Sequence, residues 1–140
     1  MPDNPSYLTG SWMDLRWSAW MPLMAAHPLA LAQLPSHPGI YRLRRVDQPG
    51  RLLWIGWAGC GVQEAMERLS RQVHLPVEPY DDPHSPATLL WSLRRTTRAA
   101  FEVSGAPLQV PGAEGKRRAR ILQRAYEGER HPPAPPDTPL

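Results

Sequence analysis

The feature that most constrains the fold is a pair of short apolar segments separated by a turn. The first reads GIYRLR over 39–44, and the second runs from Leu52 to Trp57. The first is rich in good β-formers, and the second is too short for a buried helix. Between them, Pro49 fixes φ and Gly50 can take a positive φ, which suits a type II turn over 48–51. The sequence therefore predicts an antiparallel hairpin with strands over 39–46 and 51–57.

The two faces of this hairpin differ in character. Because side chains alternate along a strand, Tyr41 and Leu43 share one face, and Ile40, Arg42 and Arg44 share the other. The second set mixes an apolar residue with two arginines. We therefore expect one face of the hairpin to line a polar site or groove.

Proline divides the rest of the chain of 140 residues. Residues 1–11 are polar and rich in turn formers, and the apolar stretch over 17–34 is interrupted by Pro22 and Pro28, which indicates a broken helical segment rather than a membrane span. No signal peptide is recognisable. The last nine residues contain five prolines. We predict an N-terminal extension with a helical segment over 1–34, one folded domain over 35–131 and a disordered Pro-rich tail over 132–140.

The body of the domain shows alternating helix and strand patterns. Helical spacing of apolar residues predicts a helix over 61–73, followed by a proline-rich loop over 75–86. A short helix over 87–93, a strand over 100–103 and a helix over 113–126 complete the order. The expected fold is α/β (α+β), with a small three-stranded antiparallel sheet flanked by helices.

Charge and cysteine content narrow the function. The formal net charge is +3, and nearly all positive charge comes from arginine, since Lys116 is the only lysine. Arginine binds phosphate with forked hydrogen bonds, so this bias favours an anionic partner, although it also fits codon bias. The single cysteine, Cys60, excludes an internal disulfide and a cysteine-rich zinc site. It fits a cytoplasmic location, and we expect no membrane partner.

The motifs Gly39-Ile40-Tyr41 and Trp54-Ile55-Gly56 together resemble the opening hairpin of the GIY-YIG nucleases, with tryptophan in place of the second tyrosine. The resemblance extends over roughly 35–127, through an arginine on the following helix and the linker that starts at residue 79. It implies a DNA endonuclease of restriction, repair or mobile-element type, which hydrolyses phosphodiester bonds with a divalent metal.

The resemblance also implies roles for individual residues. Tyr41 takes the place of the family's candidate base, and a helix arginine contacts the scissile phosphate. Arg68 suits this role better than Arg71, because it flanks the apolar stripe whereas Arg71 lies nearly opposite it. Trp54 has no hydroxyl and can only pack or donate its indole N–H. His84 is a further candidate for proton transfer, the alternative being a structural loop histidine.

The metal ligand does not follow from the motif. The family's glutamate on the last helix corresponds to Arg118 or Ala119 here, and neither can bind Mg²⁺ or Mn²⁺. Glu114, one turn earlier, is the substitute metal ligand, although its charge in the first turn also simply favours the helix dipole. We therefore expect weak or absent cleavage. The alternative function is a degenerate GIY-YIG-fold module that binds nucleic acid or protein without cutting.

Several basic side chains are expected to contact DNA or RNA. They are Arg42 and Arg44 on the hairpin, Arg71 on the first long helix, and Lys116, Arg117, Arg118 and Arg120 on the last helix. The basic run on the last helix wraps around more than one side, so at least part of it is expected to face a partner.

Overall fold

The computed structural model describes residues 5–24, 31–79 and 82–130. The elements are η1 (Ser6–Leu8), η2 (Trp12–Asp14), β1 (Met21–Pro22), β2 (Gly39–Arg45), β3 (Gln48–Ala58), α2 (Val62–Val73), α3 (Ala87–Thr97), β4 (Phe101–Pro107) and α4 (Gly112–Arg130). The predicted Pro-rich tail lies outside the described residues. Both long helices, the short helix and the last strand are confirmed, most of them longer than predicted.

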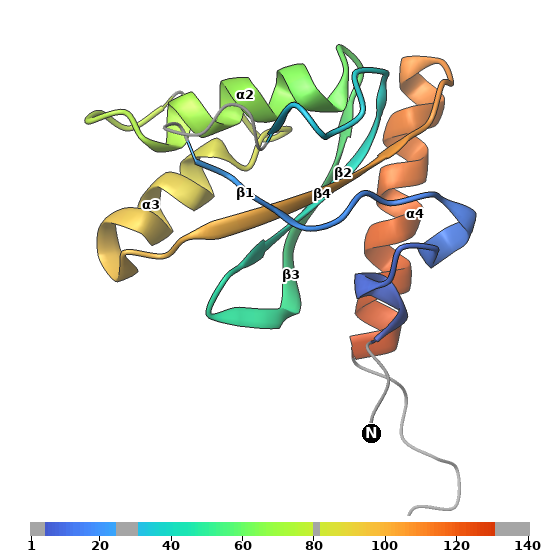
Figure 1. Ribbon diagram of the computed structural model, residues 1–140, viewed down its shortest axis with the longest axis horizontal. Helices are drawn as coiled ribbons and strands as arrows, with labels where there is room; N and C mark the ends of the chain where they lie inside the picture. The colour runs from blue at the N-terminus through green and yellow to red at the C-terminus, as the bar shows by residue number, and fades with distance from the viewer. Residues whose placement is uncertain (1–4, 25–30, 80–81, 131–140) are drawn as a thin grey trace, which may run out of the picture.

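The sheet has four antiparallel strands in the order β1-β4-β2-β3 (Figure 1). The mixed α/β class is confirmed, but the expectation of three strands was wrong. The additional strand is β1, in which Met21 pairs with Val103 and Pro22 with Glu102. Two residues, one of them a proline, are too few to show an alternating pattern, and proline is tolerated because β1 lies at a sheet edge. The opposite edge is formed by β3.

The hairpin is present, but its turn differs from the prediction. The proline and glycine at 49–50 lie inside β3, and the chain reverses at Val46 and Asp47 instead. Arg45 closes this turn by donating from Nε and Nη2 to the two carboxylate oxygens of Asp47, each over 2.9 Å. The register then shifts around Leu53, so that Leu43 faces Trp54 while Arg44 faces Leu52. This side-chain closure of the turn overrides the Pro-Gly signal.

The sheet separates two apolar layers (Figure 1). Helices α2 and α3 cover the face that carries Tyr41 and Leu43. The other face, which carries Ile40 and Ile55, is covered by α4 and by the N-terminal segment. This alternation along β2 confirms the predicted faces of the hairpin.

The N-terminal segment over 5–24 is packed against the sheet. Its buried aromatic side chains include Tyr7, Trp12 and Trp17. Tyr7 meets Tyr126 of α4 edge to face with ring centroids 4.7 Å apart, and its hydroxyl donates to the Gly50 carbonyl over 2.8 Å. The predicted helical segment is not helical over 17–24, and residues 25–30 lie outside the described part. Among the described residues, no helix is long and apolar enough to cross a membrane.

Candidate functional site

The two motifs of the hairpin meet over one glycine. In the register of β2 and β3, Tyr41 lies opposite Gly56. A Cβ at position 56 would lie 2.5 Å from the Tyr41 hydroxyl and 2.9 Å from Trp54 Nε1. Both aromatic side chains therefore lie on the same face of the sheet and close together, and they require glycine beneath them.

The Tyr41 phenol is held in its neutral form. Burial raises the pKa of Tyr41 well above its usual value, the nearby indole N–H of Trp54 lowers it, and the negative charge of Asp82 adds to the rise. Trp54 Nε1 is buried and has no hydrogen-bond partner of good geometry among the described residues. A neutral phenol donates one hydrogen bond and accepts another, so Tyr41 is suited to orient a water or a phosphate oxygen.

A cavity of about 260 Å³ brings four polar side chains together. Tyr41 forms part of its wall from β2, Arg68 comes from α2, and Asp82 and His84 come from the loop before α3. Three of these four were predicted to belong to one site although they are far apart in sequence. We call this space the Tyr41 cavity.

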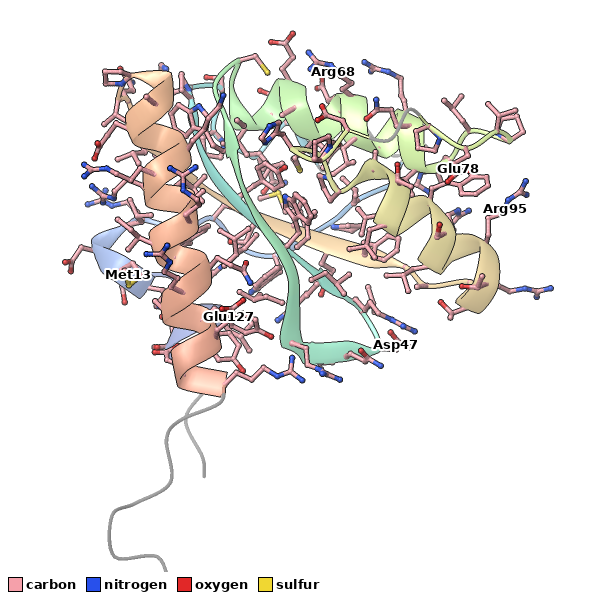
Figure 2. All side chains as sticks on the ribbon, turned by 180° about the vertical axis from the view of Figure 1, so that it is seen from behind. Met13, Asp47, Arg68, Glu78, Arg95 and Glu127 are labelled. Atoms are coloured by element: carbon pink, nitrogen blue, oxygen red, sulfur yellow. The ribbon has the colours of Figure 1, made fainter. Side chains whose placement is uncertain are left out.

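Arg68 lies at the rim of this cavity. Its side chain is 55% exposed and forms a loose ion pair with Glu64 over 3.6 Å, so most of its charge remains available. Figure 2 shows it projecting from α2 toward the outside of the molecule. The same flank of α2 contributes Ala65 and Gln72 to the cavity, whereas Arg71 does not line it. Of these two arginines, Arg68 is therefore the one that lines the Tyr41 cavity.

Asp82 is the site residue that the sequence reasoning missed. The segment at 79–84 was noted as a linker, but its carboxylates were not considered as partners of Tyr41. Asp82 Oδ1 accepts a hydrogen bond of 2.9 Å from the backbone N–H of His84. This contact fixes the Asp82 carboxylate against the loop backbone, while Asp82 and His84 are both exposed residues at the cavity. In the sequence, the two successive aspartates before Pro83 could have indicated a carboxylate at this site.

Glu114, the predicted metal ligand, is not part of this site. It forms an ion pair with Arg117 on its own helix. The buried stripe of α4 consists of Gly115, Ala119, Leu122 and Tyr126. Glu114 lies about 160° around the helix from Lys116, which lines the hollow next to the Tyr41 cavity. The inward face of α4 therefore runs through Gly115 and Ala119 and does not include Glu114.

The carboxylates around the cavity limit how a metal could be held. No group of three or more His, Cys, Asp or Glu side chains that could hold a metal is found within the described ranges. Among the residues that the structure describes, Asp82 is the only carboxylate that lines the Tyr41 cavity. Mg²⁺ is often bound through one or two carboxylates together with waters and substrate phosphates. Asp82 is therefore the residue that fits this role.

A groove continues from the cavity along β3. A neighbouring hollow of about 290 Å³ shares Trp57 and His84 with the Tyr41 cavity, and a further hollow of about 400 Å³ continues past Ile55. We call these two hollows the β3 groove. Its lining includes Trp54, Ile55, Trp57, His84, Lys116 and Arg120.

The walls of the β3 groove are held by close packing. Trp57 packs directly against Gly115, and a Cβ there would overlap its indole ring. This contact brings α4 close to the sheet edge. Lys116 and Arg120 then lie on the flank of α4 that faces the groove, whereas Arg117 does not line it. Arg118 is half-buried and also lies outside the groove lining.

Arg42 and Arg44, predicted to contact nucleic acid, lie inside the fold. Arg42 is 1% exposed and donates to the carbonyls of Tyr7 over 2.6 Å and Thr9 over 2.8 Å. Its guanidinium carbon lies 4.3 Å from the Trp17 ring centroid. Burial, and secondarily Arg44, lower the pKa of Arg42 to about 9, so it stays charged at neutral pH.

Arg44 is likewise engaged within the fold. It pairs with Glu102 over 3.0 Å, and its guanidinium carbon stacks 4.0 Å from the Trp20 ring centroid. The polar face of the hairpin therefore fixes the N-terminal segment to the sheet. The expectation that this face lines a ligand site was wrong, because the N-terminal segment covers it.

Comparison with known proteins adds no assignment. No family model, no curated protein and no solved structure matches this chain. The resemblance to GIY-YIG nucleases therefore rests on the sequence motifs alone.

Proposed function

We propose that this chain binds nucleic acid along the β3 groove and hydrolyses a phosphodiester bond at the Tyr41 cavity, as a GIY-YIG-type endonuclease of the cytoplasm. The observation that carries the proposal is the convergence of Tyr41, Arg68, Asp82 and His84 on one cavity. These groups supply a hydrogen-bonding phenol, a cation for phosphate, a carboxylate and an imidazole. The basic groove beside them would hold the flanking backbone.

The proposed roles follow from the chemistry of each side chain. Arg68 would contact the phosphate oxygens and stabilise the charge that develops on them. His84 would accept the proton of the attacking water, because imidazole is the side chain most often used for this purpose. Tyr41, which is neutral, would position the water by a hydrogen bond rather than act as a base itself.

Asp82 would hold Mg²⁺ or Mn²⁺ if the reaction uses a metal. The ion would act as a Lewis acid on the phosphate. Because the protein contributes only this one carboxylate within the described residues, we expect slower cleavage than with a fuller ligand set. Asp82 lines the same cavity as Tyr41, and its negative charge adds to the raised pKa of the phenol.

A second function is a module that binds nucleic acid without cutting it. Two observations favour it: Glu114 points away from the cavity, and Tyr41 is held neutral by burial. In this alternative the β3 groove still binds nucleic acid, but the Tyr41 cavity does not hydrolyse a phosphodiester bond. Binding and cleavage must therefore be measured separately.

Binding is tested by the salt dependence of DNA affinity. Replacing Lys116 and Arg120 together by glutamine should lower the slope of log K against log salt by about 1.5, because each phosphate contact contributes about 0.7 to 0.9. The matched control replaces Arg117 and Arg124 by glutamine, which are exposed on the same helix but do not line the groove. Fluorescence anisotropy with a labelled duplex and with a labelled single strand measures the salt slope of each protein variant.

The outcomes separate the two functions. If both double variants changed the salt slope equally, or if the wild type had no affinity for DNA at low salt, the β3 groove would not be the binding site. If binding holds, a plasmid-nicking assay with Mg²⁺ or Mn²⁺ follows. Nicking by the wild type supports the endonuclease, and binding without nicking at high enzyme concentration supports the non-cleaving module.

A further inference from the structure

A second cavity lies at the far end of α2, away from the site above. It has a volume of about 380 Å³ and is lined by the end of α2, the following loop and one side of α3. The charged and aromatic lining residues are His74, Trp91, Arg94, Arg95 and Arg98. Within the described part of the chain, no aspartate or glutamate lines this cavity. Figure 2 shows Arg95 on α3, well apart from Arg68 on α2.

Hydrogen bonds hold several of these side chains in place. Trp91 Nε1 donates to the Leu75 carbonyl over 3.0 Å, and Arg95 Nη2 donates to the Pro76 carbonyl over 3.0 Å. The Arg95 guanidinium carbon also lies 4.7 Å from the Trp91 ring centroid. His74 Nδ1 lies 2.7 Å from the Ser70 carbonyl, to which it donates. The cavity wall is therefore ordered before any ligand arrives.

The arginines themselves remain available. Among the described residues, none of Arg94, Arg95 and Arg98 forms an ion pair. Glu78, an acidic side chain on the following loop, does not line the cavity. Part of this positive charge is expected at the C-terminus of α3, because the helix dipole stabilises cations there. The dipole alone does not explain why three guanidinium groups surround one cavity.

The backbone at Arg98 gives an independent indication. Arg98 caps α3 in the left-handed region, with φ 56° and ψ 31°. This position usually carries glycine, because a side chain there costs about 1 to 2 kcal/mol. An arginine kept at a strained position beside a cavity points to a use for its side chain.

We propose that this cavity is a second anion site, which binds a phosphoryl group through Arg94, Arg95 and Arg98. Arginine suits such a ligand because its planar fork matches two phosphate oxygens. The phosphoryl group would come either from a nucleic-acid backbone or from a small phosphoester. The proposal does not depend on cleavage at the Tyr41 cavity.

Thermal unfolding in phosphate tests the site. At about ten times its dissociation constant, inorganic phosphate should raise the melting temperature of the wild type by about 4 °C or more relative to chloride at equal ionic strength. In the double variant Arg94→Gln and Arg98→Gly this rise should fall by at least half. Glycine at 98 suits the left-handed backbone, so this change does not impair folding of the cap.

Two control variants identify where the phosphate acts. Arg124→Gln removes an exposed arginine of α4 and should retain the full rise in melting temperature. Arg68→Gln removes the cation of the Tyr41 cavity. A rise that is lost in Arg68→Gln but retained in the double variant would place the phosphate in the Tyr41 cavity and overturn the proposal. The proposal is overturned if the double variant retains the phosphate-induced rise in melting temperature. It is also overturned if Arg124→Gln loses this rise equally, or if chloride raises the melting temperature as much as phosphate does.

The affinity of the same double variant for a labelled oligonucleotide identifies the source of the phosphoryl group. A roughly tenfold loss of oligonucleotide affinity would mean that the cavity binds a backbone phosphate. An unchanged oligonucleotide affinity, together with a smaller rise in melting temperature in phosphate, would mean that it binds a small phosphoester.

Discussion

At the scale of single residues, the environment of Tyr41 decides which chemistry is available. Its hydroxyl is buried beside an indole N–H and near a carboxylate, which holds the phenol neutral at working pH. In the unfolded chain a tyrosine ionises near pH 10. Above that pH the unfolded state has lost a proton that the folded state still binds. The contribution of Tyr41 to stability is therefore complete below pH 10 and decreases as the pH rises above it.

This loss can be measured by urea unfolding at pH 8 and pH 11. The free energy of unfolding of the wild type should fall by about 1 kcal/mol more than that of Tyr41→Phe over this interval. The comparison with phenylalanine is needed because burial also raises the pKa of Tyr126. Equal losses in the two proteins would show that the Tyr41 phenol is not shielded as described.

Arg42 shows what could not be predicted at this scale. Alternation along β2 correctly placed it on the face opposite Tyr41, but alternation does not say what covers that face. The cover is the chain over 5–24, whose aromatic side chains follow no helical or strand period. Its carbonyls at Tyr7 and Thr9 accept hydrogen bonds from the two terminal nitrogens of the guanidinium, whereas Arg42 Nε has no partner among the described residues. Asp82 was missed for a similar reason, because loop geometry has no periodic signal.

At the scale of elements, α4 shows how a single glycine sets the position of a helix. Trp57 at the end of β3 lies against Gly115, whereas nothing lies within 4 Å of a Cβ at Gly128 on the same helix. The first glycine permits close approach of α4 to the sheet edge. The second only weakens the helix, because glycine is unfavourable in a helix interior.

The two glycines should therefore respond to alanine with opposite signs. Gly115→Ala should destabilise the protein by about 1 to 3 kcal/mol, because the new methyl group overlaps the indole ring. Gly128→Ala should stabilise it by about 0.5 to 1 kcal/mol. Chemical denaturation of the two variants checks both values. Stabilisation by both would mean that Trp57 does not pack on α4.

Prediction from sequence succeeded for elements with a clear period and failed where the period was misleading. The 3.6-residue spacing located α2. The same reasoning misplaced the inward face of α4, because Gly115 and Ala119 are core positions without large side chains. Glu114 was assigned as a metal ligand for that reason. The strand β1 was missed because two residues carry no pattern.

At the scale of the whole molecule, the sheet separates a structural face from a candidate functional edge. Arg42 and Arg44 use one face of β2 to attach the N-terminal segment, while the other face presents Tyr41 to α2 and α3 (Figure 1). The β3 edge then runs between the Tyr41 cavity and the basic flank of α4. Residues from three separate parts of the chain reach one cavity only through this arrangement.

The measurement that tests this arrangement most directly is cleavage of a plasmid with Mg²⁺ by matched carboxylate variants. Asp82→Asn should lower the cleavage rate by about 10² or more, as should Arg68→Gln and Tyr41→Phe, because each removes a group that lines the cavity. Glu114→Gln should cleave like the wild type, since Glu114 pairs with Arg117 on the opposite flank of α4. Loss of cleavage in Glu114→Gln with full activity in Asp82→Asn would contradict the account.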